Sequence, residues 1–79
     1  MAALHMTMDR LAVDQSATVR AIGETCAMKT RLRDLGLVEG TAVRCVLKGP
    51  SGSLAAYEIR GAVIALRRQD AAAVLVEAH

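Results

Sequence analysis

The segment at residues 30–40, which reads TRLRDLGLVEG, constrains the fold more than any other part of the chain because it contains a complete helix ending. Met28, Leu32 and Leu35 recur at i, i+4 and i+7, which is the spacing of one apolar helix face. Gly36 follows directly and supplies the left-handed residue that closes such a helix. The segment therefore predicts a short helix that ends sharply.

The residues on either side of this ending extend the unit. Leu37 stands where it can fold back onto Leu32, the hydrophobic contact of a Schellman ending. Gly40 suits the third position of a type II turn over residues 38–41, because that position requires a positive φ. Upstream, Thr25 is a suitable N-cap, since its hydroxyl can accept a hydrogen bond from a free amide of the first turn. A tight turn into a strand is expected after the helix.

The rest of the chain shows the alternation of apolar and polar residues that is typical of short strands. Strands are expected at residues 17–23, 42–48, 54–60, 62–66 and 74–77, with a type I turn at 49–52 and one helical turn at 67–72. A single helix follows the first of these five strands. This order predicts a mainly β fold that closes into a small barrel, since closure removes exposed strand edges.

Strand alternation and the apolar helix stripe converge on one predicted core. Residues 1–10 show neither period and are expected to be a loose leader, within which Met6 or Met8 could be the native start. Residues 11–79 form the predicted barrel domain. The expected core consists of Val19, Leu32, Leu35, Val43, Leu47, Ile59, Ile64, Leu66, Val74 and Val76.

Composition excludes several classes of function. A chain of 79 residues has room for one domain only. Ten Lys and Arg against eight Asp and Glu give a net charge of +2, and Tyr57 is the only aromatic residue, which disfavours nucleic-acid binding. The longest apolar run, at residues 71–76, is too short to cross a bilayer, and no apolar secretory signal opens the chain. A soluble, cytoplasmic protein is expected.

The residues that could carry chemistry are scattered. His5 and His79 lie near the ends of the chain, where a side chain is not expected to be held in the fixed position that a general base requires. Cys26 and Cys45 have no partner at a motif spacing and are expected to be small apolar fillers. Phosphate-binding loops are absent. The ligand-type residues follow no metal-site spacing, so no catalytic residue, cofactor or metal site is predicted; they are His5, His79, Cys26, Cys45, Asp70 and Glu77.

Taken together, these motifs resemble the FeoA family, the small cytosolic partners of the bacterial ferrous-iron transporter FeoB. The resemblance covers residues 11–77 and rests on the order RLRDLG at 31–36, then Gly40 and Val43, Pro50 with Gly52, and LRRQDA at 66–71 before Val74 and Val76. Two departures lie in turns. Glu39 stands where proline is usual, and Asp14 with Gln15 replaces another common Pro-Gly pair.

The resemblance implies an SH3-like β-barrel and a non-enzymatic accessory protein of ferrous-iron uptake. It implies that the protein binds the cytosolic G-protein part of FeoB and reaches the membrane only through that partner. Two alternatives stay open. One is a small metal-binding chaperone that delivers Fe²⁺, and the other is a nucleic-acid-binding small barrel.

SH3-like barrels commonly bind partners through the loop after the first strand, which here contains the helix. Basic side chains on the outer side of this helix, beside apolar anchors beyond Gly36, are the composition of an interface centre. A solvated basic face that keeps the protein soluble is the alternative for each charge. The hairpin tip is expected as a neighbour. The expected partner-binding residues are Arg31, Arg33, Leu37, Val38, Pro50 and Ser51.

Overall fold

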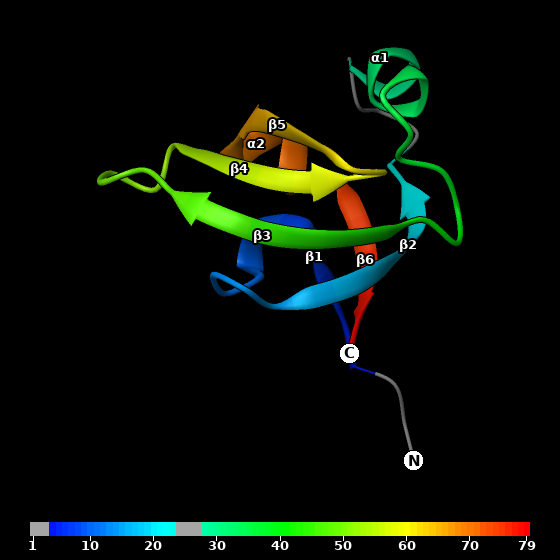
Figure 1. The fold of residues 1–79 in the computed structure, drawn as a ribbon. Helices are drawn as coiled ribbons and strands as arrows, with labels where there is room; N and C mark the ends of the chain where they lie inside the picture. Colours follow the sequence, from blue (N-terminus) through cyan, green and yellow to red (C-terminus); the bar gives the residue numbers. More distant parts are fainter. Residues whose placement is uncertain (1–3, 24–27) are drawn as a thin grey trace.

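The computed structural model describes residues 4–23 and 28–79, which form six strands and three short helical segments (Figure 1). In chain order these are β1 (Leu4–Thr7), the 3₁₀ turn η1 (Met8–Arg10), β2 (Ser16–Ile22), α1 (Lys29–Asp34), β3 (Ala42–Lys48), β4 (Leu54–Ile59), β5 (Ala62–Arg67), α2 (Arg68–Ala71) and β6 (Val74–Ala78). The five predicted strands correspond to β2–β6, each within one residue of its expected ends.

The strands pair antiparallel in a single curved sheet with the order β1-β6-β2-β3-β4-β5. The predicted mainly β fold is therefore confirmed. The prediction of five strands is wrong by one, and the predicted closure is also wrong, because no ladder joins β5 to β1 in the described part of the chain. The physical reason is that the helical turn α2 follows β5 at once and packs against η1, which separates the C-terminal end of β5 from β1.

The predicted loose leader is wrong for residues 4–10. All four residues of β1 pair with β6, for example Met6 with Val76. The Met8 side chain is fully buried, and the Tyr57 hydroxyl donates to the Met8 carbonyl oxygen at 3.4 Å. Alternation in Leu4–Thr7 is only four residues long and contains no β-branched apolar residue, so it gives little strand signal. Residues 1–3 lie outside the described residues.

The predicted helix ending is confirmed. Gly36 has φ +108°, and its N–H donates to the Arg33 carbonyl at 3.0 Å. The Leu37 N–H donates to the Leu32 carbonyl at 3.0 Å, which completes the bond pair of a Schellman motif. The predicted N-cap, Thr25, lies outside the described residues.

Both predicted tight turns are also present. In the type II turn, Gly40 has φ +90° and the Thr41 N–H donates to the Val38 carbonyl at 3.0 Å. In the hairpin turn between β3 and β4, the Gly52 N–H donates to the Gly49 carbonyl at 3.0 Å. These hydrogen bonds fix the turn that leads from α1 into β3 and the turn that connects β3 to β4.

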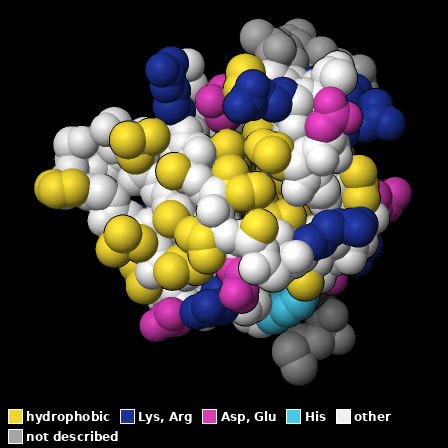
Figure 2. All heavy atoms as spheres, turned by 45° about the horizontal axis from the view of Figure 1, so that its top comes forward, with side chains coloured by type: hydrophobic (Ala, Val, Ile, Leu, Met, Phe, Trp, Pro, Cys, Tyr) yellow, Lys and Arg dark blue, Asp and Glu magenta, His cyan; other side chains and the backbone are white. Residues whose placement is uncertain are grey.

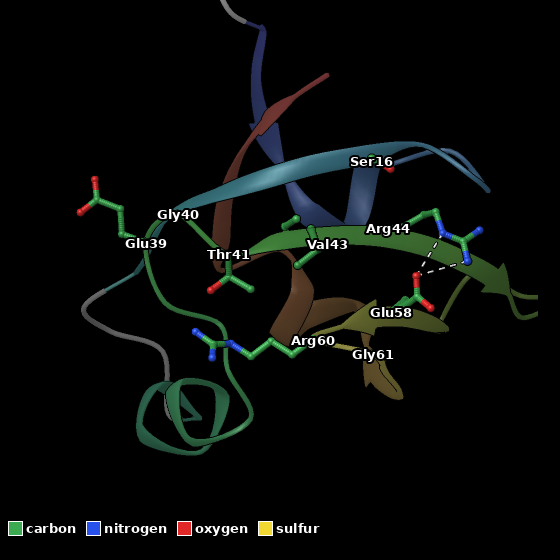
Figure 3. A pocket seen from close by; sticks show the side chains of 10 residues that line it. Ser16, Glu39, Gly40, Thr41, Val43, Arg44, Glu58, Arg60 and Gly61 are labelled. Carbon is green, nitrogen blue, oxygen red and sulfur yellow. Dashed lines mark hydrogen bonds and ion pairs between the residues drawn. The ribbon is translucent and has the colours of Figure 1, made fainter.

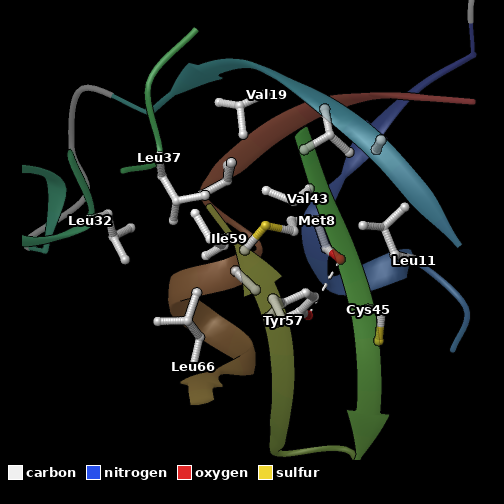
Figure 4. Close-up of a cluster of buried hydrophobic side chains, with 14 residues drawn as sticks. Met8, Leu11, Val19, Leu32, Leu37, Val43, Cys45, Tyr57, Ile59 and Leu66 are labelled. Atoms are coloured by element: carbon white, nitrogen blue, oxygen red, sulfur yellow. Dashed lines mark hydrogen bonds between the residues drawn. The ribbon is translucent and has the colours of Figure 1, made fainter. Parts of the chain in front are cut away.

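The core is one cluster of aliphatic side chains around Tyr57 (Figure 4). Leu35 and Ile64, which the sequence predicts in the core, are only partly buried against it. The predicted core residues that are buried are Val19, Leu32, Val43, Ile59, Leu66, Val74 and Val76. The cluster also contains Met8, Leu11, Ala17, Leu37, Cys45, Tyr57 and Ala71.

Leu47 is the predicted core residue that the structure places outside, with 63% of its surface exposed. The pairing of β3 with β4 passes from Cys45–Tyr57 to Leu47–Ala56, so one extra residue, Val46, is inserted in β3. Such a bulge shifts the following residues by one position, and a shift of one position turns a side chain to the opposite face. Leu47 therefore lies on the outer face of the sheet.

Candidate partner-binding surface

The two basic residues expected to form one contact surface lie on different sides of α1. Arg31 lines a hollow between α1 and β5, whereas Arg33 lines another hollow beside β2, together with Val38. Residues two apart on a helix project about 200° apart, so this separation follows from helix geometry. The expected partner-binding residues of α1 therefore belong to two surfaces.

The expectation that Leu37 is an accessible apolar anchor is wrong, because its side chain is fully buried. The Schellman ending explains this result. It brings Leu37 back over the end of α1, where Leu37 and Leu32 both join the core cluster (Figure 4). Val38, the next residue, is 37% exposed and is the apolar side chain that this loop offers to solvent.

The hairpin tip is not a neighbour of α1, contrary to the expectation. Pro50 and Ser51 are exposed at the turn between β3 and β4, at the left of Figure 1, and α1 lies at the upper right. Ser51 instead lies beside the end of β5, where it lines a hollow of about 740 Å³ with Arg67. Partner binding by Arg31, Arg33, Val38, Pro50 and Ser51 stays a prediction, and because Arg31 and Arg33 line different hollows they are alternatives rather than parts of one contact.

One hollow combines an apolar floor with basic side chains at its rim. This α1–β5 groove has a volume of about 610 Å³ and runs between α1 and the open edge of the sheet. Figure 2, in which this side comes forward, shows hydrophobic side chains gathered across the face, with Lys and Arg side chains around them. The groove is lined by Met28, Arg31, Leu35, Leu54, Ile64, Ala65, Leu66, Arg67, Gln69 and Asp70.

The apolar surface continues beyond the groove onto the outer face of β3, β4 and β5. Leu47, Leu54 and Val63 are 63%, 50% and 61% exposed, and the pairing register places Ala56 and Ala65 side by side between them. Contiguous exposed apolar surface is typical of protein–protein contact sites. Strand alternation alone does not predict this patch, because it places Leu47 in the core.

A second hollow, of about 730 Å³, is lined by both polar and apolar residues, and one of its two arginines, Arg44, is ion-paired (Figure 3). Arg44 reaches Glu58 at 3.4 Å and Asp14 at 3.1 Å, so its charge is already balanced within the chain. Arg60 lies at the other side of the hollow, next to Thr41, whose buried hydroxyl has no hydrogen-bond partner among the described residues. The α1–β5 groove is the better candidate for a partner because it combines an apolar floor with two arginines that have no ion-pair partner in the described part of the chain.

Side chains of β1, β2 and the last residues of the chain come together on the outer face of the sheet. His5 Nε2 lies 3.4 Å from Glu77 Oε1, and Arg20 Nη2 lies 2.9 Å from the same oxygen. The hydrogen bonds from Arg20, supported by His5, hold the pKa of Glu77 below its usual range. His79 Nε2 is 2.6 Å from the Thr18 hydroxyl. The sequence alone does not predict these contacts, because they depend on the pairing of β6 with both β1 and β2.

The described residues contain no group of three or more His, Cys, Asp and Glu side chains placed to hold a metal ion. The absence of a metal site, a cofactor and a catalytic residue stays a prediction. Asp70, another ligand-type residue, lies in the α1–β5 groove, away from the two histidines.

The filler role predicted for the cysteines is confirmed for Cys45. Its side chain is fully buried, and burial raises the pKa of its thiol. A buried thiol with a raised pKa holds little thiolate and is a poor nucleophile. Cys26 lies outside the described residues. In the described part of the chain, no helix has the length and apolar character needed to span a bilayer.

Comparison with known proteins settles the relationship of this fold. The family model for the FeoA domain matches residues 6–78, which is nearly the whole chain. The chain belongs to the FeoA family. The resemblance carried by the motifs between residues 31 and 76 is thereby confirmed. No curated protein matches the sequence.

Solved structures of FeoA proteins superimpose closely on this chain. A FeoA-like protein from Clostridium acetobutylicum has a TM-score of 0.87 and 26% identity, over 99% of this chain and 90% of the other. Stenotrophomonas maltophilia FeoA, solved as a zinc complex and described as an SH3 domain protein, has a TM-score of 0.80 and 36% identity, over 90% and 88%. A manganese-dependent transcriptional repressor shares the fold alone, at 15% identity, and the chain covers 44% of that protein.

Proposed function

We propose that this FeoA-family protein is a non-enzymatic accessory protein of ferrous-iron uptake. It acts in the cytoplasm as an SH3-like domain that binds the cytosolic G-protein part of a FeoB-type transporter. Family membership supports the link to ferrous-iron transport, and the 36% identical Stenotrophomonas maltophilia protein is described as a candidate activating factor of that transport.

The observation that carries the proposal is the α1–β5 groove. Its apolar floor, formed by Leu35 and Ile64 among others, adjoins an exposed apolar sheet face, and two arginines stand at its rim. Apolar surface beside arginine is the composition of protein-binding sites. The chemistry-bearing side chains support the same reading, because the one described thiol is buried and the histidines are engaged with Glu77 and Thr18.

Delivery of Fe²⁺ by the protein itself is the weaker candidate, although the Stenotrophomonas maltophilia relative is a zinc complex. Glu77 is the carboxylate nearest to a histidine, and Arg20 already binds its oxygen at 2.9 Å. A cation at this site would have to displace or face the guanidinium, which opposes binding. Nucleic-acid binding is also disfavoured, because Tyr57, the single aromatic, is buried and cannot stack on a base.

The test is a binding measurement between the full chain and the cytosolic part of a FeoB-type transporter, with and without guanine nucleotide. Saturable binding is expected in at least one nucleotide state. Arg31→Glu should weaken it, whereas Arg33→Glu should not, because Arg33 lies on the other side of the same helix. Absence of binding in every nucleotide state would contradict the proposal.

A further inference from the structure

The outer edge of β5 is an unpaired strand edge. β5 stands last in the sheet order and pairs only with β4 among the described strands. The Arg68 N–H donates to the Ser53 carbonyl at 2.9 Å, so the backbone of residue 68 points toward the strand that contains Ser53 and β4. Along an antiparallel pair, every second residue bonds to the neighbouring strand. Backbone groups of residues 62, 64 and 66 therefore point toward β4, and those of Val63, Ala65 and Arg67 point away from it. Three consecutive outward positions are available to another strand.

This edge lacks the features that usually block strand addition. Natural proteins protect edges with proline, bulges, charges or very short strands. β5 pairs with β4 in regular register over six positions, contains no proline, and carries a charge only at its last residue, Arg67. The other edge strand, β1, has only four residues. β5 is the edge of this sheet that can accept a strand.

The α1–β5 groove lies directly along this edge. Met28 and Leu35, which flank α1, line it together with Ile64 of β5, and all three are partly buried against the core. Side chains of a strand alternate between its faces, so every second side chain of an added strand would enter this apolar floor. Because α1 stands beside the edge, the space suits a single extended segment better than the broad sheet of a second copy.

The charges at the rim define the chemistry of that segment. Arg31 and Arg67 are both exposed, and neither has an ion-pair partner in the described part of the chain. Asp70 is the single acidic residue in the lining, so the groove carries a net positive charge. Carboxylates bind arginine through paired hydrogen bonds.

We propose that β5 accepts an extended segment of a partner protein as a seventh strand of the sheet, with alternate apolar residues in the α1–β5 groove and carboxylates at Arg31 and Arg67. This is strand addition, in which backbone hydrogen bonds give affinity and side-chain pockets give specificity. The inference rests on the proposed function in taking the segment to belong to the transporter's cytosolic part.

Amide hydrogen exchange of the full chain, alone and saturated with the transporter's cytosolic part, tests the inference. The Val63 and Ala65 amides should exchange rapidly in the free protein and at least tenfold more slowly in the complex. The amide of Ile64, which points toward β4, is the internal reference and should be protected in both states.

A pair of variants supplies the second readout. Ala65→Pro removes an outward N–H without removing a bond to β4, and proline is tolerated on strand edges, so binding should fall at least tenfold. Arg67→Glu, which leaves the backbone unchanged, should also weaken binding, whereas Lys48→Glu, outside the groove, should not.

Three results would overturn the inference. Binding without protection of Val63 and Ala65 would leave the proposed function standing and reject strand addition. Protection that rises with the concentration of the free protein would mean that a second copy occupies the edge. No binding of the unmodified chain would reject both the inference and the proposed function.

Discussion

The Met8→Ala variant tests whether residues 4–10 are part of the folded domain, as in the six-stranded fold, or form a loose leader outside it. The Met8 side chain is fully buried and lies in the same cluster as Tyr57 and Ile59. Truncation of a buried methionine costs about 2–5 kcal/mol, from lost apolar burial and from the cavity that remains. A domain of 79 residues has a total stability of about 4–12 kcal/mol. Met8→Ala should therefore remove a large part of the free energy of unfolding.

The matched control is Leu47→Ala, because the simplest strand pattern puts Leu47 in the core and Met8 outside it. Leu47 is 63% exposed beyond the bulge in β3, so its truncation should change the free energy of unfolding by about 0.5 kcal/mol or less. Urea unfolding followed by far-ultraviolet circular dichroism measures both. For a domain of this size, a loss of 2 kcal/mol lowers the melting temperature by about 8–16 °C.

The reasoning fails if the order of the two variants is reversed. A larger loss for Leu47→Ala would mean that the bulge is absent and that β3 continues in regular alternation. No loss for Met8→Ala would mean that η1 does not contribute to the core.

Three further predictions concern pH and backbone geometry. Burial, with Cys45 and Asp9 nearby, raises the pKa of Tyr57 to about 12. The contribution of Tyr57 to the free energy of unfolding should therefore be fully present below pH 10 and fall by about 3 kcal/mol as the pH rises from 10 to 12. Tyr57→Phe should remove this alkaline loss in urea titrations. The lowered pKa of Glu77 adds stability that is present above pH 4.5 and lost as the pH falls through the lower folded value, so Glu77→Gln should flatten the acid limb of the stability curve. Gly36→Ala should lower the free energy of unfolding by about 1–2 kcal/mol, because φ is +108° at this position and the new Cβ would lie 2.9 Å from Arg60 Cδ. Thermal melts measure this loss, and an unchanged melting temperature would contradict the Schellman geometry.

Local signals made much of the fold predictable. The end of α1, the type II turn at Gly40 and the hairpin turn at Pro50 each depend on a few adjacent residues whose conformational preferences are strong. Strands β2–β6 follow from alternation that runs over several residues. Both kinds of signal act within one segment, so they can be read without knowing which segments meet.

The features that were missed depend on pairing between distant segments. The alternation of Val43, Cys45 and Leu47 is unbroken in the sequence, and the bulge appears only in the register of β3 against β4. β1 is a strand because β6 pairs with it, not because residues 4–7 favour one. The separation of Arg31 from Arg33 could have been predicted from helix geometry alone.

The candidate site was only partly predictable for the same reason. The basic residues of α1 are predictable from the sequence. The opposite wall of the groove comes from β5, more than 25 positions later in the chain, and only the three-dimensional fold brings Ile64 beside Leu35. The buried position of Leu37 follows from the Schellman contact, which is incompatible with an exposed anchor.

The central claim is that the α1–β5 groove binds the cytosolic part of a FeoB-type transporter. Titration calorimetry with two double variants of equal charge change tests it most directly: Arg31→Glu with Arg67→Glu inside the groove, and Arg33→Glu with Lys48→Glu outside it. The account predicts that the groove pair raises the dissociation constant at least tenfold, or about 1.4 kcal/mol, and that the outside pair leaves it unchanged. Equal weakening by both pairs would indicate non-specific charge attraction, and unchanged binding by the groove pair would contradict the claim.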